Sequence, residues 1–288
     1  MTAPGLVSLV GAGPGDPELL TLRALRRLRE ADLVLNDALV PSALLELAPR
    51  ARRFFVGKRA GRHSIEQTTI HGLMIRAARR GERVVRLKCG DPFVLGRGGE
   101  EALALAAAGI PYEVVPGLSS AIAGPALAGI PVTHRGLASG FAVVSGHAEA
   151  AYAPILAGIA PGTLTLVVLM GLGARAAIAR FLIARGWPAA TPAAVVQGAS
   201  HPGSATWTGA LTDVGTAELA PELPGILVIG AVASLADAIR AVAPAPADTA
   251  ALADALVPAS TPAAAAPAAS ALPAFATADP ALALGRTP

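Results

Sequence analysis

A strand, a glycine-rich loop and a helix follow one another in residues 84–108, and this succession constrains the fold more than any other feature of the sequence. Residues 84–88 carry β-branched and other apolar side chains and are flanked by glycines, which predicts a buried strand. Residues 100–108 are rich in Ala, Leu and Glu, which favours a helix that Gly109 can end. A strand joined to a helix by a short loop is the repeating unit of α/β folds with a parallel sheet.

The loop between this strand and helix is a candidate ligand site. Ligands of open parallel sheets bind beyond the carboxyl ends of the strands, where Gly90 and Asp91 are expected. A glycine lets the backbone approach a ligand closely, and a carboxylate can bind a polar or cationic group. The alternative is a plain turn that Asp91 and Pro92 merely start.

A second glycine-rich turn lies near the start of the chain. Residues 6–10 predict a strand, and residues 11–17 read Gly-Ala-Gly-Pro-Gly-Asp-Pro. Asp16 can cap a helix whose first residue is Pro17. The leucines expected on the buried face of that helix are Leu19, Leu20, Leu22, Leu25 and Leu28.

This turn departs from the dinucleotide-binding fingerprint. Asp16 stands at the position of the third glycine, and Pro14 lacks the N–H that a pyrophosphate would need. Asp37 ends the second predicted strand, about where a ribose-binding acid would lie, so a dinucleotide cofactor remains an alternative. A ligand without phosphates fits the turn better.

Basic residues are concentrated in one part of the chain. Residues 23–97 hold 17 of the 23 Lys and Arg residues, and the rest of the chain is net acidic. This distribution favours an anionic partner, either a nucleic acid or a small polycarboxylate or phosphate, with solvated helix faces as the alternative for many of the arginines. One loop, residues 57–64, is expected to bind an anion because it contains Lys58, Arg59, Arg62 and His63.

The second half of the chain predicts another α/β unit. Ser119 or Ser120 can cap a helix over residues 121–128, and the Gly- and Pro-containing stretch 129–136 indicates a boundary. Strands expected after the boundary, with antiparallel pairing among them, are residues 141–144, 164–169, 194–197, 206–208 and 226–229. We therefore expect two α/β domains, residues 1–136 and 137–242, followed by an Ala/Pro-rich tail, residues 243–288, that is expected to be disordered.

Composition excludes several classes of protein. Hydrophobic residues make up 53% of the chain, but many are alanine, and the longest strongly apolar runs are too short to span a bilayer. The first residues do not resemble a signal peptide, so a cytoplasmic protein that binds no membrane is expected. One cysteine excludes an internal disulfide, and the five histidines have no metal-ligand spacing, so no metal is expected.

Five segments, in order, resemble the motif set of the uroporphyrinogen-III C-methyltransferases, a branch of the tetrapyrrole methylases. The resemblance extends over residues 6–235. The segments are residues 10–17, 56–63, 86–93 (Arg-Leu-Lys-Cys-Gly-Asp-Pro-Phe), 96–101 and 129–135.

The resemblance implies a fold, a reaction and a site. It implies two α/β domains with a cleft between them that binds S-adenosylmethionine and releases S-adenosylhomocysteine, a homodimer, and C-methylation of uroporphyrinogen III to precorrin-2 for sirohaem or cobalamin. It implies Asp37 as a general base and Lys58 as a second catalytic residue. The implied cofactor-binding residues are Pro14, Cys89, Gly90, Asp91, Val94, Ser119, Ser120, Met170 and Ala199. The substrate's carboxylates are expected to bind Arg59, Arg62, Arg86 and Arg135. Because the resemblance begins at residue 6, no fused oxidase or chelatase domain is expected.

Three departures from the family's motifs leave alternatives open. The family usually has Tyr-Asp-Arg where this chain has Asn36, Asp37 and Ala38, and Gly where this chain has Cys89. It usually has Asn-Ala or Asn-Gly at residues 198–199. A methylase of a later corrin intermediate or of ribosomal RNA, and a catalytically impaired binding protein, therefore remain alternatives. Aromatic residues make up 3% of the chain, which argues against nucleic-acid binding by base stacking.

Overall fold

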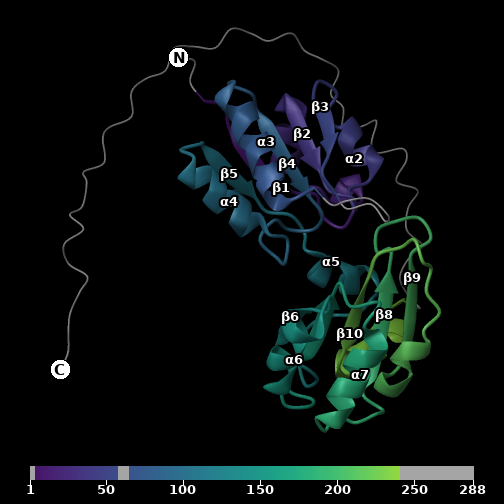
Figure 1. Ribbon diagram of the computed structural model, residues 1–288. Coiled ribbons are helices and arrows are strands. Elements are labelled where there is room, and N and C mark those ends of the chain that lie inside the picture. Colours follow the sequence, from purple (N-terminus) through teal and green to yellow (C-terminus); the bar gives the residue numbers. More distant parts are fainter. Residues whose placement is uncertain (1–3, 58–64, 241–288) are drawn as a thin grey trace, which may run out of the picture. The chain divides into compact units, whose positions relative to one another are not determined.

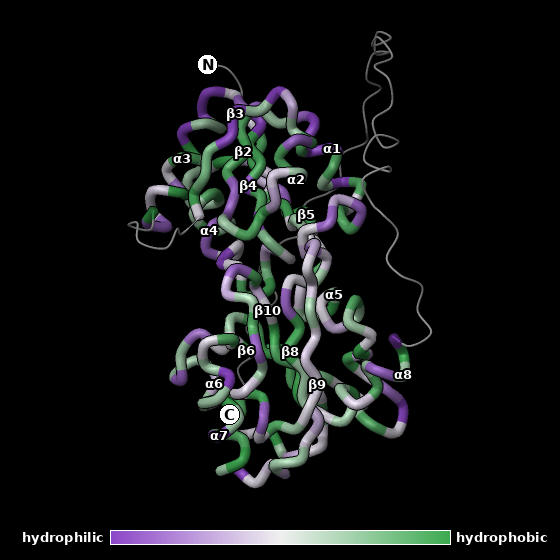
Figure 2. The backbone as a smooth tube through the Cα atoms, turned by 90° about the vertical axis from the view of Figure 1, so that its right-hand side faces the viewer, coloured by the Kyte–Doolittle hydropathy of each residue, from purple (hydrophilic) through white to green (hydrophobic). Residues whose placement is uncertain are grey.

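The computed structural model describes residues 4–57 and 65–240, which form two five-stranded sheets with helices packed on them (Figure 1). The α/β class predicted from the sequence is confirmed. Hydrophobic segments run along the central strands, such as β2 and β10 (Figure 2). In the described ranges, every helix is too short or too polar to cross a membrane.

The first sheet is fully parallel, with the order β3-β2-β4-β1-β5. Helices cover both faces, since one face packs against α3 and α4 and the other against α1 and α2. Its strands are β1 (Val7–Gly11), β2 (Leu33–Asn36), β3 (Arg52–Phe55), β4 (Val84–Lys88) and β5 (Tyr112–Val115). The helices are α1 (Leu22–Glu30), α2 (Ser42–Glu46), α3 (Gln67–Arg79) and α4 (Gly98–Ala107). The central strands are buried on both faces, which explains why their sequences are mostly continuous apolar runs.

The second sheet is mixed, with the order β6-β7-β10-β8-β9. Only the β6–β7 pair is parallel, and the antiparallel pairing predicted for this half is confirmed. Its strands are β6 (Phe141–Ser145), β7 (Thr165–Leu169), β8 (Pro192–Gln197), β9 (Ala205–Ala210) and β10 (Gly225–Ile229). The helical elements of this half are α6 (Glu149–Ala157), α7 (Arg175–Ala184), α8 (Ala236–Arg240) and the short 3₁₀ segments Leu211–Thr216 and Ala231–Leu235.

Helix α5 (Ser120–Leu127) packs against the second sheet although it precedes it in the chain. Ala121, from the start of this helix, shares a hydrophobic cluster with Val167 of β7 and Val228 of β10. Ile130 and Ala138 belong to the same cluster, so residues on either side of position 136 pack against the second sheet. The division of the chain at residue 136 remains a proposal.

The start of α1 differs from the sequence-based expectation. Asp16 caps a short 3₁₀ turn, Pro17–Leu19, whereas Thr21 caps the α-helix by accepting a hydrogen bond from the Ala24 N–H at 3.2 Å. The phase of the helix therefore changes, and Leu22 is 78% exposed instead of buried. Two capping residues five positions apart competed for this helix start, and the apolar pattern alone does not choose between them.

Candidate active site

A cavity of about 450 Å³ lies beyond the carboxyl ends of strands of the first sheet and is also lined by residues of the second sheet. Loops that follow β1, β2 and β4 contribute to its wall, and most lining side chains are apolar. Its volume is within the range of small-molecule sites. Six residues predicted to bind a cofactor line it: Pro14, Cys89, Val94, Ser120, Met170 and Ala199.

Close backbone packing fixes the loops behind this cavity. A Cβ atom on Gly11 would lie 2.5 Å from the Gly117 nitrogen, and one on Gly117 would lie 2.3 Å from the Gly90 oxygen. Gly90 also has a φ of +67°, in the left-handed region that favours glycine. Its N–H donates to the Gly13 carbonyl at 2.8 Å, so the loops after β1, β4 and β5 form one rigid junction.

Three further residues predicted at the cofactor shape this junction without lining the cavity wall. They are Gly90, Asp91 and Ser119. Asp91 accepts hydrogen bonds from the backbone N–H of Phe93 at 2.8 Å and of Gly117 at 3.1 Å. Ser119 caps α5, as predicted, by accepting from the Ala121 N–H at 3.3 Å. The Asp91 carboxylate therefore ties the β4 loop to the β5 loop.

Non-glycine residues with left-handed backbone gather at the cavity. Leu95 and Met170, with φ of 52° and 57°, line it, and Ser200, with φ of 71°, stands between the lining residues Ala199 and His201. Such conformations cost about 1–3 kcal/mol each and are typical of binding and catalytic sites. The Ser200 hydroxyl also accepts a hydrogen bond from the Asp16 N–H at 3.2 Å, which joins this loop to the loop after β1.

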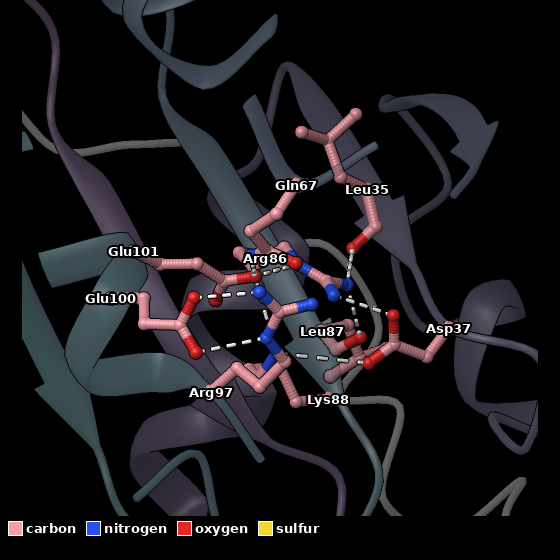
Figure 3. Close-up of polar contacts among 9 residues, drawn as sticks. All are labelled: Leu35, Asp37, Gln67, Arg86, Leu87, Lys88, Arg97, Glu100 and Glu101. Carbon is pink, nitrogen blue, oxygen red and sulfur yellow. Dashed lines mark hydrogen bonds and ion pairs between the residues drawn. The ribbon is translucent and has the colours of Figure 1, made fainter. Parts of the chain in front are cut away.

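A network of charged side chains extends from the interior of the first sheet to Asp37 (Figure 3). Arg86 donates to Glu101 Oε1 at 2.9 Å and to Asp37 Oδ1 at 2.5 Å. Lys88 lies two residues further along β4, on the same face, and donates to Glu101 Oε1 at 3.2 Å. Gln67 of α3 donates to the same oxygen at 3.0 Å. Both cations of β4 are thus paired inside the protein.

Burial changes the proton affinity of two residues beside Asp37. Burial lowers the pKa of Lys88, and the neighbouring Arg86 guanidinium lowers it further, while the carboxylates of the network oppose this shift. Burial raises the pKa of the Cys89 thiol above its ordinary value, and the negative charge of Asp37 raises it further. Leu39, two residues after Asp37, and Cys89, next to Lys88, both line the cavity, so the network ends close to it.

Of the residues predicted to bind the substrate's carboxylates, the two that the structure describes, Arg86 and Arg135, do not line the cavity. Arg86 was expected to bind a substrate carboxylate, but its side chain is 3% exposed and is occupied by Asp37 and Glu101. Arg135 is exposed to solvent. Lys58, Arg59 and Arg62 lie outside the described residues.

Sequence patterns did not single out Lys88 or Glu101. Glu101 stands among helix-forming residues, and its typical place would be a solvated helix face. A signal was nevertheless present, because Arg86 and Lys88 alternate with apolar residues on a strand predicted to be buried. Two cations on one buried face require carboxylates from neighbouring elements.

The sequence model of one protein family, the tetrapyrrole (corrin/porphyrin) methylases, matches residues 6–215 of this chain. The chain therefore belongs to the tetrapyrrole methylases, and the family resemblance inferred from the motifs is confirmed.

Two relatives and one more distant solved structure are similar to this chain over the same region. Siroheme synthase 2 of Serratia proteamaculans is 46% identical over 232 residues, which are 80% of this chain and 50% of the relative. The chain spans about half the length of the curated relatives it matches. The uroporphyrin-III C-methyl transferase of Thermus thermophilus, solved in complex with S-adenyl homocysteine, is 46% identical, with a TM-score of 0.70 and coverage of 80% of this chain and 99% of that one. A cobalt precorrin-4 methyltransferase is 26% identical, with a TM-score of 0.68 and coverage of 78% and 94%.

Proposed function

We propose that this chain transfers methyl groups from S-adenosylmethionine to carbon atoms of uroporphyrinogen III and forms precorrin-2, for sirohaem synthesis. The observation that carries the proposal is a carboxylate, Asp37, held by a buried ion-pair network beside an apolar cavity. The similarity to the Thermus thermophilus enzyme over almost all of that enzyme's length supports the same reaction.

The cavity fits S-adenosylmethionine in chemistry and size. S-adenosylmethionine carries no phosphate, so a mostly apolar wall suits it, and Met170 supplies a polarizable apolar surface there. Pro14 has no N–H to offer a phosphate. The glycine junction of Gly11, Gly90 and Gly117, whose backbones pack too closely for Cβ atoms, would support the cavity wall from behind. When bound, S-adenosylmethionine supplies an electrophilic methyl group on a positively charged sulfur.

The residues that would hold the cofactor divide into two groups. The wall would contact it directly, through Pro14, Cys89, Val94, Ser120, Met170 and Ala199. The junction residues Gly90, Asp91 and Ser119 would keep the wall in place. Met170 is 53% exposed, so its side chain has an open surface for a ligand to cover.

Asp37 would act as the base. Methylation of a ring carbon requires loss of a proton from the macrocycle, and a fixed carboxylate at the cavity can accept it. Lys58, which follows β3, would be the second catalytic residue by family resemblance. The first half of the chain also carries most of the positive charge, which favours a substrate with many carboxylates. Arg59, Arg62 and Arg135 would bind those carboxylates.

We further propose a cytoplasmic homodimer that binds no nucleic acid. Apolar side chains in and just before α5 support dimer formation, since Leu118, Ile122 and Leu127 are between 44% and 51% exposed. Exposed apolar residues grouped on one short segment are typical of protein interfaces. Sedimentation of the purified chain measures the association.

The decisive experiment is an anaerobic incubation of the purified protein with S-adenosylmethionine and uroporphyrinogen III. The expected product carries two added methyl groups, and the singly methylated compound should accumulate first. Binding of the substrate should weaken as salt rises, because the attraction is between opposite charges. Methylation of a later corrin intermediate in place of uroporphyrinogen III would contradict the proposal, and it would indicate that Asn36 and Ala38 have changed substrate choice.

A further inference from the structure

Glu101 is a fully buried carboxylate that takes no part in the proposed chemistry. Its side chain is 0% exposed. Oε1 accepts from three donors, on Gln67, Arg86 and Lys88, whereas Oε2 is buried without a hydrogen-bond partner among the described residues. Burying a carboxylate in this way is costly, and replacing a whole buried ion network by apolar residues is often neutral for stability, so the network is weak evidence for a stabilising role. A function other than stability is therefore expected for it.

Arg86 links Glu101 to Asp37, which lies near the cavity. Its Nε donates to Glu101, and its Nη1 donates to the backbone carbonyls of Leu35 and Leu87, both at 3.3 Å. Leu35 belongs to β2, the strand that ends just before Asp37. The planar guanidinium thus joins β2 to β4 and reaches Asp37 with its remaining nitrogen, Nη2. Lysine cannot reproduce this set of directions.

The two carboxylate oxygens of Asp37 therefore differ in their hydrogen bonding. Oδ1 accepts from Arg86, while Oδ2 lies 3.9 Å from the Lys88 nitrogen, which is beyond hydrogen-bond distance. The Asp37 side chain is 30% exposed, against 3% for Arg86 and 4% for Lys88. Asp37 is therefore the solvent-exposed end of the network, and Glu101 is its fully buried end.

We propose that Glu101 is a positioning residue that, through Arg86 and Lys88, fixes Asp37 so that its Oδ2 is the atom that accepts the proton. The proposal rests on the proposed function, because it assigns an orientation to the base of that reaction. Glu101 holds the Lys88 nitrogen away from Asp37. Without the charge of Glu101, two buried cations would face one carboxylate, and Lys88 would close the gap to Oδ2 and occupy the proton-accepting atom.

The test is the variant Glu101→Gln, measured for kcat, for KM with uroporphyrinogen III and for the Kd of S-adenosylhomocysteine. We expect kcat to fall about 10- to 100-fold, since small displacements of a catalytic group can cost about 10²-fold. The KM and Kd should stay within about twofold of the wild-type values. The matched control is Glu30→Gln, a half-exposed carboxylate that pairs with Arg27 on the surface, away from the network. It should leave all three constants unchanged.

Rescue separates positioning from a purely structural role. In the double variant Glu101→Gln, Lys88→Met, one cation again faces one carboxylate, and kcat should recover at least about threefold over Glu101→Gln because the coupled residues are not additive. A further decrease in the double variant would overturn the proposal. So would a kcat of Glu101→Gln within about threefold of wild type, or a raised KM with unchanged kcat, which would place the network at the substrate's carboxylates.

Two controls keep the test interpretable. If Glu101→Gln loses S-adenosylhomocysteine binding through unfolding, Glu101→Asp replaces it, because the shorter side chain keeps the charge but withdraws Oε1 from Arg86; a normal kcat in that variant would again overturn the proposal. A wild-type protein that does not methylate uroporphyrinogen III would contradict the proposed function itself. That result is distinguishable because it appears before any variant is made.

Discussion

The two sheets contribute to the candidate site in opposite ways. The parallel first sheet supplies the charged network, in which Arg86, Lys88, Glu101 and Asp37 meet at the carboxyl ends of β2 and β4. The mixed second sheet supplies apolar wall residues such as Met170 and Ala199. Parallel strands bring several loops to one edge, so residues far apart in sequence can form a charged constellation there. The difference predicts that loss of the charged network reduces turnover, whereas a substitution in the second sheet's part of the wall, which leaves the network intact, reduces cofactor affinity.

The largest effect is expected from Asp37→Asn. The amide keeps the shape of the side chain but cannot accept a proton at neutral pH, so kcat should fall at least about 100-fold. Affinity for S-adenosylhomocysteine, measured by calorimetry, should change less than about twofold. A variant that keeps more than about a tenth of wild-type turnover would show that Asp37 is not the base.

A substitution in the second sheet's wall should do the reverse. Ala199→Trp places a large ring in the cavity, and the Kd for S-adenosylhomocysteine should rise about 10-fold or more, while kcat at saturating cofactor changes much less. Ala190→Trp is the matched control, because Ala190 is exposed between α7 and β8 and does not line the cavity. Equal losses of affinity in the two variants would remove the distinction between the sheets.

Cys89 lies where the two contributions meet, and its reactivity reports on both. Because burial and Asp37 raise its pKa, alkylation by iodoacetamide should be slower than for a free thiol at pH 8 and should accelerate as pH rises through and beyond 9. Bound S-adenosylhomocysteine should protect it several-fold. Alkylation at one rate with and without the ligand would place the ligand elsewhere.

The smallest effect is expected from removal of residues 241–288. Their Ala/Pro-rich composition offers few large apolar side chains to a core, so cofactor affinity and melting temperature should stay within error of the full chain. A drop of several degrees on deletion would show that the two sheets alone do not account for the folded site.

Much of the fold could be predicted because it is encoded locally. Apolar runs next to glycines predicted strands such as β1 and β4, and Ser119 was one of two serines predicted to cap α5. The charged network could not be predicted, because it depends on strand order. Asp37 meets Arg86 only because β2 pairs with β4, and no local pattern in either strand specifies that neighbour. The exposure of Leu22 could not be predicted either, because Asp16 and Thr21 are equally good capping residues and the local sequence does not decide between them.

The place of β1 in the centre of the first sheet has a consequence for synthesis. β1 pairs with β4 and β5 and not with the strands that follow it directly in the chain. As the polypeptide emerges from the ribosome, this apolar segment must therefore remain unpaired until residues 84–88 are available, and its other edge must remain unpaired until residues 112–115 are available. Such delayed pairing slows folding and exposes a strand to aggregation, so during translation the first sheet, which carries the chemistry, is a natural client for chaperones.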